Sequence, residues 1–251
     1  MQLDMLADNS PPSPDPNDPK QKVLVIQERL CQEYGCPIGY FHNLDPLSEL
    51  VSASLSHRTK NKDSGRAFKQ LRAKFPNWEA VRDADTADVQ TAVEPCTWPE
   101  QKAPRIQQIL KQITKQQGKL SVDFLENMPV KEARKWLETL PGVGPKTSAA
   151  VLSFSTLRKR ALPVDSHHHR VAMRTGLISE KVSVGPSHKI LEAQLPEDWS
   201  AQQVYDNHEV LMLHGQRCCY YRNPECDRCV ILDLCPFGEH VLAAAKHLSK
   251  R

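Results

Sequence analysis

Four cysteines near the carboxyl end of the chain have the spacing of a metal centre. Cys219, Cys226, Cys229 and Cys235 form a C-x6-C-x2-C-x5-C pattern within seventeen residues. Four thiolates this close in sequence can hold one [4Fe–4S] cluster or one zinc ion. Zinc sites more often contain two close cysteine pairs and this pattern has one, but spacing alone leaves both alternatives open. Cys218 could replace the first ligand, although the spacing favours Cys219.

A second chemical signal is the glycine-containing turn LPGVGPKT, residues 140–147. P-loops and dinucleotide-binding turns follow a strand and place their glycines and lysine differently. A helix–hairpin–helix fits better, because Gly142 and Gly144 allow positive φ and close backbone approach, and Pro145 suits the first turn of a helix. The free N–H groups of such a turn bind a nucleic-acid phosphate without reading sequence. The alternative is a corner whose glycines only permit the bend.

Lys146 lies near the end of this turn and could act as a nucleophile or as a phosphate-binding cation. An amine attacks a sugar carbon only when it carries no proton, so a nucleophilic role requires surroundings that favour the uncharged amine. Asp165 follows nineteen residues later in VDSHHHRV, where it also fits the N-cap of a helix. The consecutive residues His167, His168 and His169 point in different directions from a helix, so they cannot all bind one metal ion.

The elements that must position these residues are predicted to be helical. Val23, Ile26 and Leu30 share one face of a first helix, and Asp45 with Pro46 can cap a second. Alternating valine-rich runs are scarce, so we expect an all-α fold. Later helices are predicted at about 145–157, 166–176, 186–194 and 200–214.

The composition is that of a soluble protein with a distinct N-terminal tail. The 251 residues are 39% hydrophobic and 25% charged. Residues 1–19 are rich in proline and acidic, with no basic residue, and are predicted to be disordered. Without their four aspartates the formal charge rises from +3 to +7. A basic body suits a polyanionic partner, although a merely solvated surface explains it equally.

Neither export nor membrane insertion is expected. The first twenty residues lack the basic and apolar regions of a signal peptide, and no run approaches the roughly 18 apolar residues of a membrane span. We therefore expect an intracellular, cytoplasmic protein whose cysteines form no disulfide framework. Cys31, Cys36 and Cys96 match no ligand pattern and are expected to be small buried or half-buried side chains.

Together these motifs resemble endonuclease III, a member of the helix-hairpin-helix DNA glycosylase superfamily. The resemblance rests on LPGVGPKTSAAVL, VDSHHHRV, LSHRTKN (residues 55–61) and the cysteine pattern, and extends over about residues 20–240. It implies an all-α fold with two helical lobes flanking a DNA groove. A six-helix barrel lobe would comprise residues 42–158, and an iron–sulfur cluster lobe would comprise residues 20–41 and 159–251.

The resemblance also implies an activity. The chain would be a bifunctional DNA glycosylase with abasic-site lyase activity, in which Lys146 forms a Schiff base and Asp165 assists. Oxidised pyrimidines are the expected bases, and Cys219, Cys226 and Cys229, with Cys235, would hold a [4Fe–4S] cluster. Double-stranded DNA with damaged bases or abasic sites would be the partner of a monomeric, nucleoid-associated protein. The alternatives are a mismatch or adenine glycosylase and a noncatalytic DNA-binding module of the same fold.

DNA contacts are implied at two regions. The first comprises the hairpin and the start of the helix after Asp165, with Gly142, Val143, Gly144, Thr147 and His167. The second holds the side chains that would fill the gap left by an extruded base. There, Arg58 stands where the family usually has glutamine, Asn61 where it usually has aspartate, and Trp98 at the second wedge position. These departures put the range of substrates in doubt, and Trp98 could instead be a core aromatic residue.

Overall fold

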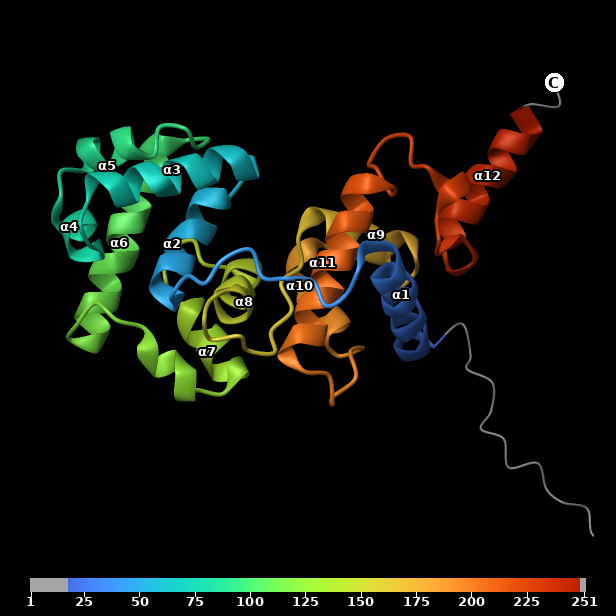
Figure 1. The fold of residues 1–251 in the computed structure, drawn as a ribbon, viewed down its shortest axis with the longest axis horizontal. Coiled ribbons are helices and arrows are strands. Elements are labelled where there is room, and N and C mark those ends of the chain that lie inside the picture. Colours follow the sequence, from blue (N-terminus) through green and yellow to red (C-terminus); the bar gives the residue numbers. More distant parts are fainter. Residues whose placement is uncertain (1–17, 249–251) are drawn as a thin grey trace, which may run out of the picture.

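The computed structural model describes residues 18–248, and every regular element in this range is a helix (Figure 1). The all-α prediction is therefore confirmed for these residues. Most of the predicted N-terminal tail, residues 1–17, lies outside the described part. No helix between residues 18 and 248 combines the length and apolar character required to cross a membrane.

One lobe contains the middle of the chain and surrounds its own core. Buried residues from Leu47 to Ala161 form this core, with Leu50, Leu71 and Leu110 fully enclosed. Its helices are α2 (Pro46–Ser56), α3 (Asn61–Lys74), α4 (Trp78–Asp83), α5 (Thr86–Ala92), α6 (Pro99–Gln117), α7 (Val130–Leu137) and α8 (Pro145–Phe154), with a 3-10 turn at Asp123–Asn127.

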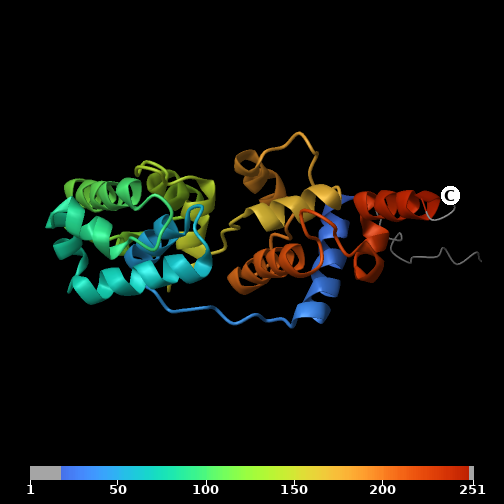
Figure 2. The ribbon, with the colours of Figure 1, turned by 90° about the horizontal axis from the view of Figure 1, so that it is seen from above.

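The other lobe joins the first described helix to the last third of the chain. Val23, Ile26 and Leu30 of the first helix lie in its core, as predicted, beside Leu162 and Val171. Its helices are α1 (Pro19–Tyr34), α9 (Ser166–Arg174), α10 (Val184–Glu192), α11 (Ala201–Arg217) and α12 (Pro236–Leu248), with 3-10 turns at Cys226–Arg228 and Leu232–Leu234. Two segments cross between the lobes, one after α1 and one after α8 (Figures 1 and 2).

Contacts between the lobes define how they face each other. Arg134 of α7 forms an ion pair with Glu192 of α10, with Nη1 and Oε2 2.7 Å apart. Phe154, at the end of α8, packs edge-on against Tyr205 of α11, and their ring centroids are 5.6 Å apart. Arg158 donates a hydrogen bond of 2.8 Å to the His42 carbonyl in the first crossing segment. These contacts hold helices of both lobes around a shared cleft.

Helices α9 and α11 of the second lobe pack closely at Gly215. A Cβ atom added at Gly215 would lie 2.8 Å from the Cβ of His167 and 3.0 Å from its carbonyl oxygen. Only glycine fits such a backbone contact. Gly215 therefore allows α9, which begins beside Asp165, to pack directly against α11.

A disulfide joins Cys31 and Cys36, which contradicts our expectation that these cysteines are unpaired. The cause is local. Gly35 ends α1 with a φ of 81°, and its N–H and that of Cys36 both bond to the carbonyl of Cys31. The chain therefore turns back on the last helical turn, which places two cysteines five positions apart with their Cα atoms 5.0 Å apart. This pairing depends on the glycine turn, which spacing alone did not reveal.

Candidate functional site

A cleft of about 1120 Å³ opens between the two lobes, and both predicted catalytic residues line it. Lys146 comes from the start of α8 in the first lobe, and Asp165 directly precedes α9 in the second. Lys146 is solvent-exposed and Asp165 is half-buried. The structure thus brings together, from opposite lobes, two residues that are nineteen positions apart in sequence.

The glycine turn is a hairpin between α7 and α8. Gly142 has a φ of 75°, in the left-handed region that favours glycine, and the side chain of Arg105 packs where its Cβ would be. Gly144 has a φ of −109°, so the expectation of positive φ holds at Gly142 and is wrong at Gly144. Gly144 instead provides the extended N-cap backbone before Pro145. Val143 is buried, and its N–H donates to the Leu140 carbonyl at 3.1 Å, so it closes the turn.

Asp165 is the N-cap of α9, as its sequence position predicted. Its Oδ1 accepts hydrogen bonds from the N–H groups of His167 at 2.9 Å and His168 at 2.8 Å. Burial raises the pKa of this carboxyl, but nearby His208 and the His168 N–H act in the opposite direction and prevail, so its pKa lies below the ordinary value. Asp165 is therefore a carboxylate at neutral pH, held at the cleft by the helix it caps.

Two buried imidazoles lie behind this carboxylate. His168 of α9 and His208 of α11 stack with ring centroids 5.7 Å apart. Burial lowers the pKa of His168 to about 3 and that of His208 to about 4, and Lys146 contributes to the shift at His208. Both rings are consequently neutral at neutral pH. Asp165 and Lys146 both act on His208, so they share one electrostatic environment.

His57, which the sequence analysis did not single out, contacts the start of α8. Its Nε2 lies 2.8 Å from Oγ1 of Thr147. Burial, and then the charges of Lys146 and Lys102, lower the pKa of His57 to about 4. Thr147 is only 4% exposed. Its side chain therefore fixes the hairpin helix to α2.

The predicted wedge residues lie together at the cleft. Arg58 and Trp98 both have positive φ, 51° and 55°, and the Arg58 guanidinium lies 5.8 Å from the centre of the Trp98 ring. Trp98 is 45% exposed, so it is not a core aromatic residue. Non-glycine residues in this backbone region are uncommon and tend to occur at functional sites.

A buried lysine holds the loop that carries Arg58. Lys102 of α6 is 6% exposed, and its Nζ donates to the carbonyl oxygens of Leu55 at 2.6 Å and His57 at 2.8 Å, and to Oγ1 of Thr59 at 2.6 Å. The three acceptors lie in the last turn of α2 and in the loop that follows it. Lys102 therefore fixes the backbone on both sides of Arg58.

The three consecutive histidines point in different directions, as predicted. His167 lines the cleft, and its Nδ1 lies 3.2 Å from Arg170. His168 is buried behind Asp165, and His169 lies 2.8 Å from the carbonyl oxygen of Val182. The geometry excludes one shared metal ion bound by all three.

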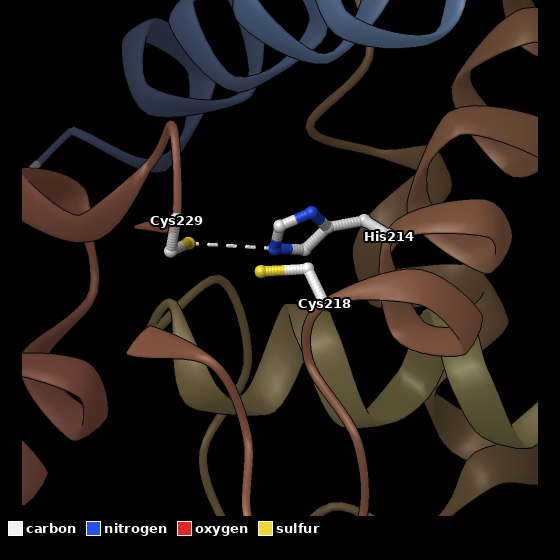
Figure 3. Close-up of side chains that lie close together, drawn as sticks. All are labelled: His214, Cys218 and Cys229. Atoms are coloured by element: carbon white, nitrogen blue, oxygen red, sulfur yellow. Dashed lines mark hydrogen bonds between the residues drawn. The ribbon is translucent and has the colours of Figure 1, made fainter. Parts of the chain in front are cut away.

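The four predicted ligand cysteines line one cavity beside α12, together with Cys218. A tighter group within this region contains His214, Cys218 and Cys229, whose potential ligand atoms lie within 4.8 Å of one another (Figure 3). In that group His214 Nε2 lies 3.5 Å from Cys229 Sγ. The choice of Cys219 over Cys218 therefore stays a prediction.

The chemistry of this cavity suits a thiolate-bound metal centre. Burial raises the pKa of Cys229 to about 12 and that of Cys235 to about 11, so a bound cation would be needed to hold them as thiolates. N–H donors already face two of the sulfurs: Arg174 lies 3.2 Å from Cys219 Sγ, and the Gly238 N–H lies 3.3 Å from Cys235 Sγ. The donor set thus fits a cluster held by four cysteines.

Comparison with known proteins agrees with this fold. A model of the HhH-GPD superfamily base excision DNA repair proteins matches residues 51–201. Endonuclease III of Escherichia coli K12 is 28% identical over 222 residues, which are 88% of this chain and 98% of that protein. A candidate DNA glycosylase of Arabidopsis thaliana is 30% identical over 172 residues, which are 68% of this chain, and this chain spans only 57% of that relative.

A solved structure shows the same architecture. The trapped covalent intermediate of an endonuclease III with DNA matches with a TM-score of 0.75 at 22% identity, over 89% of this chain and 98% of that one. Two all-α lobes with a hairpin and a shared cleft define the fold of a DNA glycosylase. The chain belongs to the HhH-GPD superfamily of base excision DNA repair proteins, and its predicted resemblance to endonuclease III is confirmed.

Several residues of the site were missed by the sequence analysis. They are His57, Lys102, Arg105, His208 and Glu209, all of which line the cleft. A signal in the sequence was available for His208 and Glu209. Four consecutive polar residues, DNHE at 206–209, interrupt a helix whose other residues nearby are apolar. A polar band in a buried helix indicates either a hydrogen-bond network or a site.

Proposed function

We propose that this protein is a bifunctional DNA glycosylase with abasic-site lyase activity, acting on damaged bases and on oxidised pyrimidines in particular. The observation that carries the proposal is the pair of Lys146 and Asp165, which line one cleft from opposite lobes. A flipped nucleotide could enter this cleft, whereas its C1′ is unreachable inside the duplex stack. Endonuclease III relatives support the same class of reaction.

The reaction can be written with these two residues. The uncharged amine of Lys146 attacks C1′, the C1′–N bond breaks, and the base leaves with the bonding electron pair and takes up a proton. The sugar opens to a Schiff base on Lys146. Loss of a proton from C2′ then expels the 3′ phosphate by β-elimination. The Asp165 carboxylate stabilises the positive charge that develops on the sugar, and it can accept the proton of the attacking amine.

DNA contacts follow the surfaces on either side of the cleft. The N–H groups at Gly142, Gly144 and Thr147 would bind a backbone phosphate without reading sequence. The Val143 N–H, which the sequence analysis included, already donates to the Leu140 carbonyl at 3.1 Å. His167 lines the opposite wall. Arg58 and Trp98 would fill the gap left by the extruded nucleotide and stack on its former partner base. Such a duplex is the proposed partner of a monomeric enzyme associated with the nucleoid.

The second lobe, with its cysteines, would support the DNA-binding surface. We propose that Cys219, Cys226, Cys229 and Cys235 hold a [4Fe–4S] cluster, which when bound would cross-link the segment from residue 219 to 235. Arg174 of α9 already contacts this segment through the Tyr220 and Tyr221 carbonyls, at 2.7 and 3.1 Å. The separate cores of the lobes support the proposed domains, 42–158 and 20–41 with 159–251.

The experiment separates the two chemical steps. Duplexes containing an abasic site, an oxidised pyrimidine, an oxidised purine or a mismatch are incubated with the protein, and base release and strand scission are measured independently. The proposal requires scission of the abasic duplex and release of the oxidised pyrimidine. Base release without scission would instead favour a monofunctional mismatch or adenine glycosylase, and binding without either reaction would favour a noncatalytic module.

Variants of the two residues test their roles. Lys146→Gln should abolish both scission and release while DNA binding persists. Asp165→Asn should preserve DNA binding and slow turnover, because an amide can still cap α9 but carries no negative charge. Turnover at the wild-type rate in a folded Asp165→Asn protein would show that the residue acts only as a cap.

A further inference from the structure

Helix α11 carries a band of four buried polar residues, of which two bind other elements and two line the cleft. Asp206 Oδ1 accepts from the Ile38 N–H at 2.9 Å and from Gln202 Nε2 at 2.8 Å. Asn207 Nδ2 donates to Gln27 Oε1 at 3.0 Å. These two residues therefore have a structural role, because they fix α11 to α1 and to the crossing segment.

The other two residues, His208 and Glu209, line the cleft. Glu209 is only 1% exposed, and its Oε1 has no hydrogen-bond partner within residues 18–248. The nearest base, His208 Nε2, is 3.9 Å from Oε1, which is too far for a hydrogen bond. A buried carboxyl without partners is unfavourable for folding, so its presence points to a ligand that completes it.

The surroundings of Glu209 match an extruded base. Met212 lies one turn along α11 and also lines the cleft, and the Phe154 ring lies 5.5 Å from the ring of His208. Asp165 is close enough to influence the ionisation of Glu209. An apolar wall, the unpartnered Oε1 of Glu209 and the proposed catalytic pair thus line one cleft, as in pockets that enclose a flat ligand with few polar contacts.

We propose that Glu209 is a catalytic residue for base release, donating a hydrogen bond from its carboxyl O–H to a carbonyl oxygen of the extruded base. The inference rests on the proposed glycosylase function and names a further residue for it. As the C1′–N bond breaks, the bonding electrons pass to the base, and negative charge develops on its carbonyl oxygen. A donor at that atom stabilises the departing base. The substrates favoured are bases with a carbonyl group, which includes oxidised pyrimidines.

The protonation state of Glu209 supports this role. Burial, and then the neighbouring carboxylates of Asp165 and Asp206, raise its pKa to about 8. The carboxyl therefore keeps its proton at neutral pH and can donate. The ionisable groups around it in the cleft include Asp165 at the start of α9, Glu49 of α2, whose pKa burial also raises to about 8, and, through His208, Lys146 of α8. His208 itself is uncharged at neutral pH.

The test compares Glu209→Leu and Glu209→Gln with the wild-type protein in single-turnover assays. Glu209→Leu should release an oxidised pyrimidine on the order of 10- to 100-fold more slowly, because one hydrogen bond to developing charge is lost. It should cut a preformed abasic duplex at the wild-type rate, since that substrate has no base. Glu209→Gln keeps an N–H donor and should recover most of the release rate.

Two further measurements distinguish a catalytic role of Glu209 from a merely structural one. In the wild-type protein, the rate of base release relative to the rate of abasic cleavage should decline as the pH rises above about 8, because Glu209 loses its proton there. The Glu209→Leu variant should lack this decline and unfold at no lower temperature than wild type.

Wild-type release rates in a folded Glu209→Leu protein would overturn the inference while leaving the glycosylase proposal intact. Equal losses of base release and abasic cleavage would also overturn it. A wild-type protein inactive on every duplex would refute the proposed function itself.

Discussion

His57 Nε2 lies 2.8 Å from Thr147 Oγ1, and this contact fixes the end of α2 to the residue that follows Lys146. The neutral imidazole and the hydroxyl form one hydrogen bond whose donor depends on the histidine tautomer. The proposed nucleophile thus stands on a hairpin that is held from two sides, by α7 within the hairpin and by α2 through His57.

We predict that His57→Leu slows cleavage of an abasic duplex by roughly 10-fold, because misplacement of a nucleophile by about 1 Å is costly. DNA affinity should change little. Thr147→Val removes the same contact from the other side and should give a similar loss, whereas Thr147→Ser keeps the hydroxyl and serves as the control. A wild-type rate in both His57→Leu and Thr147→Val, measured by single-turnover scission, would disprove the positioning role.

Acid should destabilise the protein through His168 and His208. Their pKa values fall from 6.5 to about 3 and about 4 on folding, so below pH 6.5 the unfolded chain binds protons that the folded chain does not. The stability that these two histidines contribute is therefore retained above pH 6.5 and lost as the pH falls below it, by on the order of 1–2 kcal/mol per histidine by pH 5. Glu49 and Glu209, whose pKa burial raises to about 8, shift the stability in the opposite direction. Urea unfolding of the intact protein at a series of pH values measures this slope.

The variant His168→Phe provides the control for that slope. It keeps a flat ring against His208 but removes one titrating group, so between pH 6.5 and pH 5 it should lose on the order of 1–2 kcal/mol less stability than wild type. An unchanged slope would show that other groups cause the acid sensitivity.

Lys102→Met should lower the free energy of unfolding by about 1–3 kcal/mol, because three buried or half-buried acceptors lose their donor. It should also weaken binding to duplexes containing an abasic site, since the loop carrying Arg58 loses its anchor. Lys111→Met, at an exposed position of the same helix, is the matched control. Denaturant unfolding and a binding titration check both effects, and equal stability of the two variants would contradict the anchoring role.

Gly215→Ala should destabilise the second lobe, because the new Cβ would meet the backbone of His167 at 3.0 Å. Gly65→Ala provides the opposite case. Gly65 lies exposed within α3 with no atom within 4 Å of an added Cβ, so alanine there should stabilise the helix by roughly 0.5–1 kcal/mol. Thermal unfolding of both proteins tests the pair. A stabilising Gly215→Ala would show that α9 and α11 can separate without cost.

Local signals in the sequence predicted much of this arrangement. Asp165 was expected to cap a helix, and Pro145 to begin one, because capping depends on residues within one helical turn. The helices of the second lobe were placed to within a few residues; α11, for example, extends to Arg217 where residue 214 was expected. The cysteine spacing marked the segment that surrounds the cavity beside α12.

Features that depend on distant contacts could not be predicted in this way. Nothing near Glu209 in sequence reveals that its carboxyl lacks a partner, because that depends on how α9 and α8 pack against α11. The same holds for His57, whose partner Thr147 is ninety positions away. The disulfide between Cys31 and Cys36 required the turn at Gly35, and the extended backbone of Gly144 required the observed hairpin geometry.

The most direct test of the account is to trap the covalent intermediate and locate its attachment. The protein is incubated with an abasic duplex and borohydride, digested, and the modified peptide is sequenced by mass spectrometry. We predict that the reduced sugar is attached to Lys146 and that Lys146→Gln yields no adduct. An adduct on another residue, or an undiminished yield from Lys146→Gln, would contradict the assignment of Lys146 as the nucleophile.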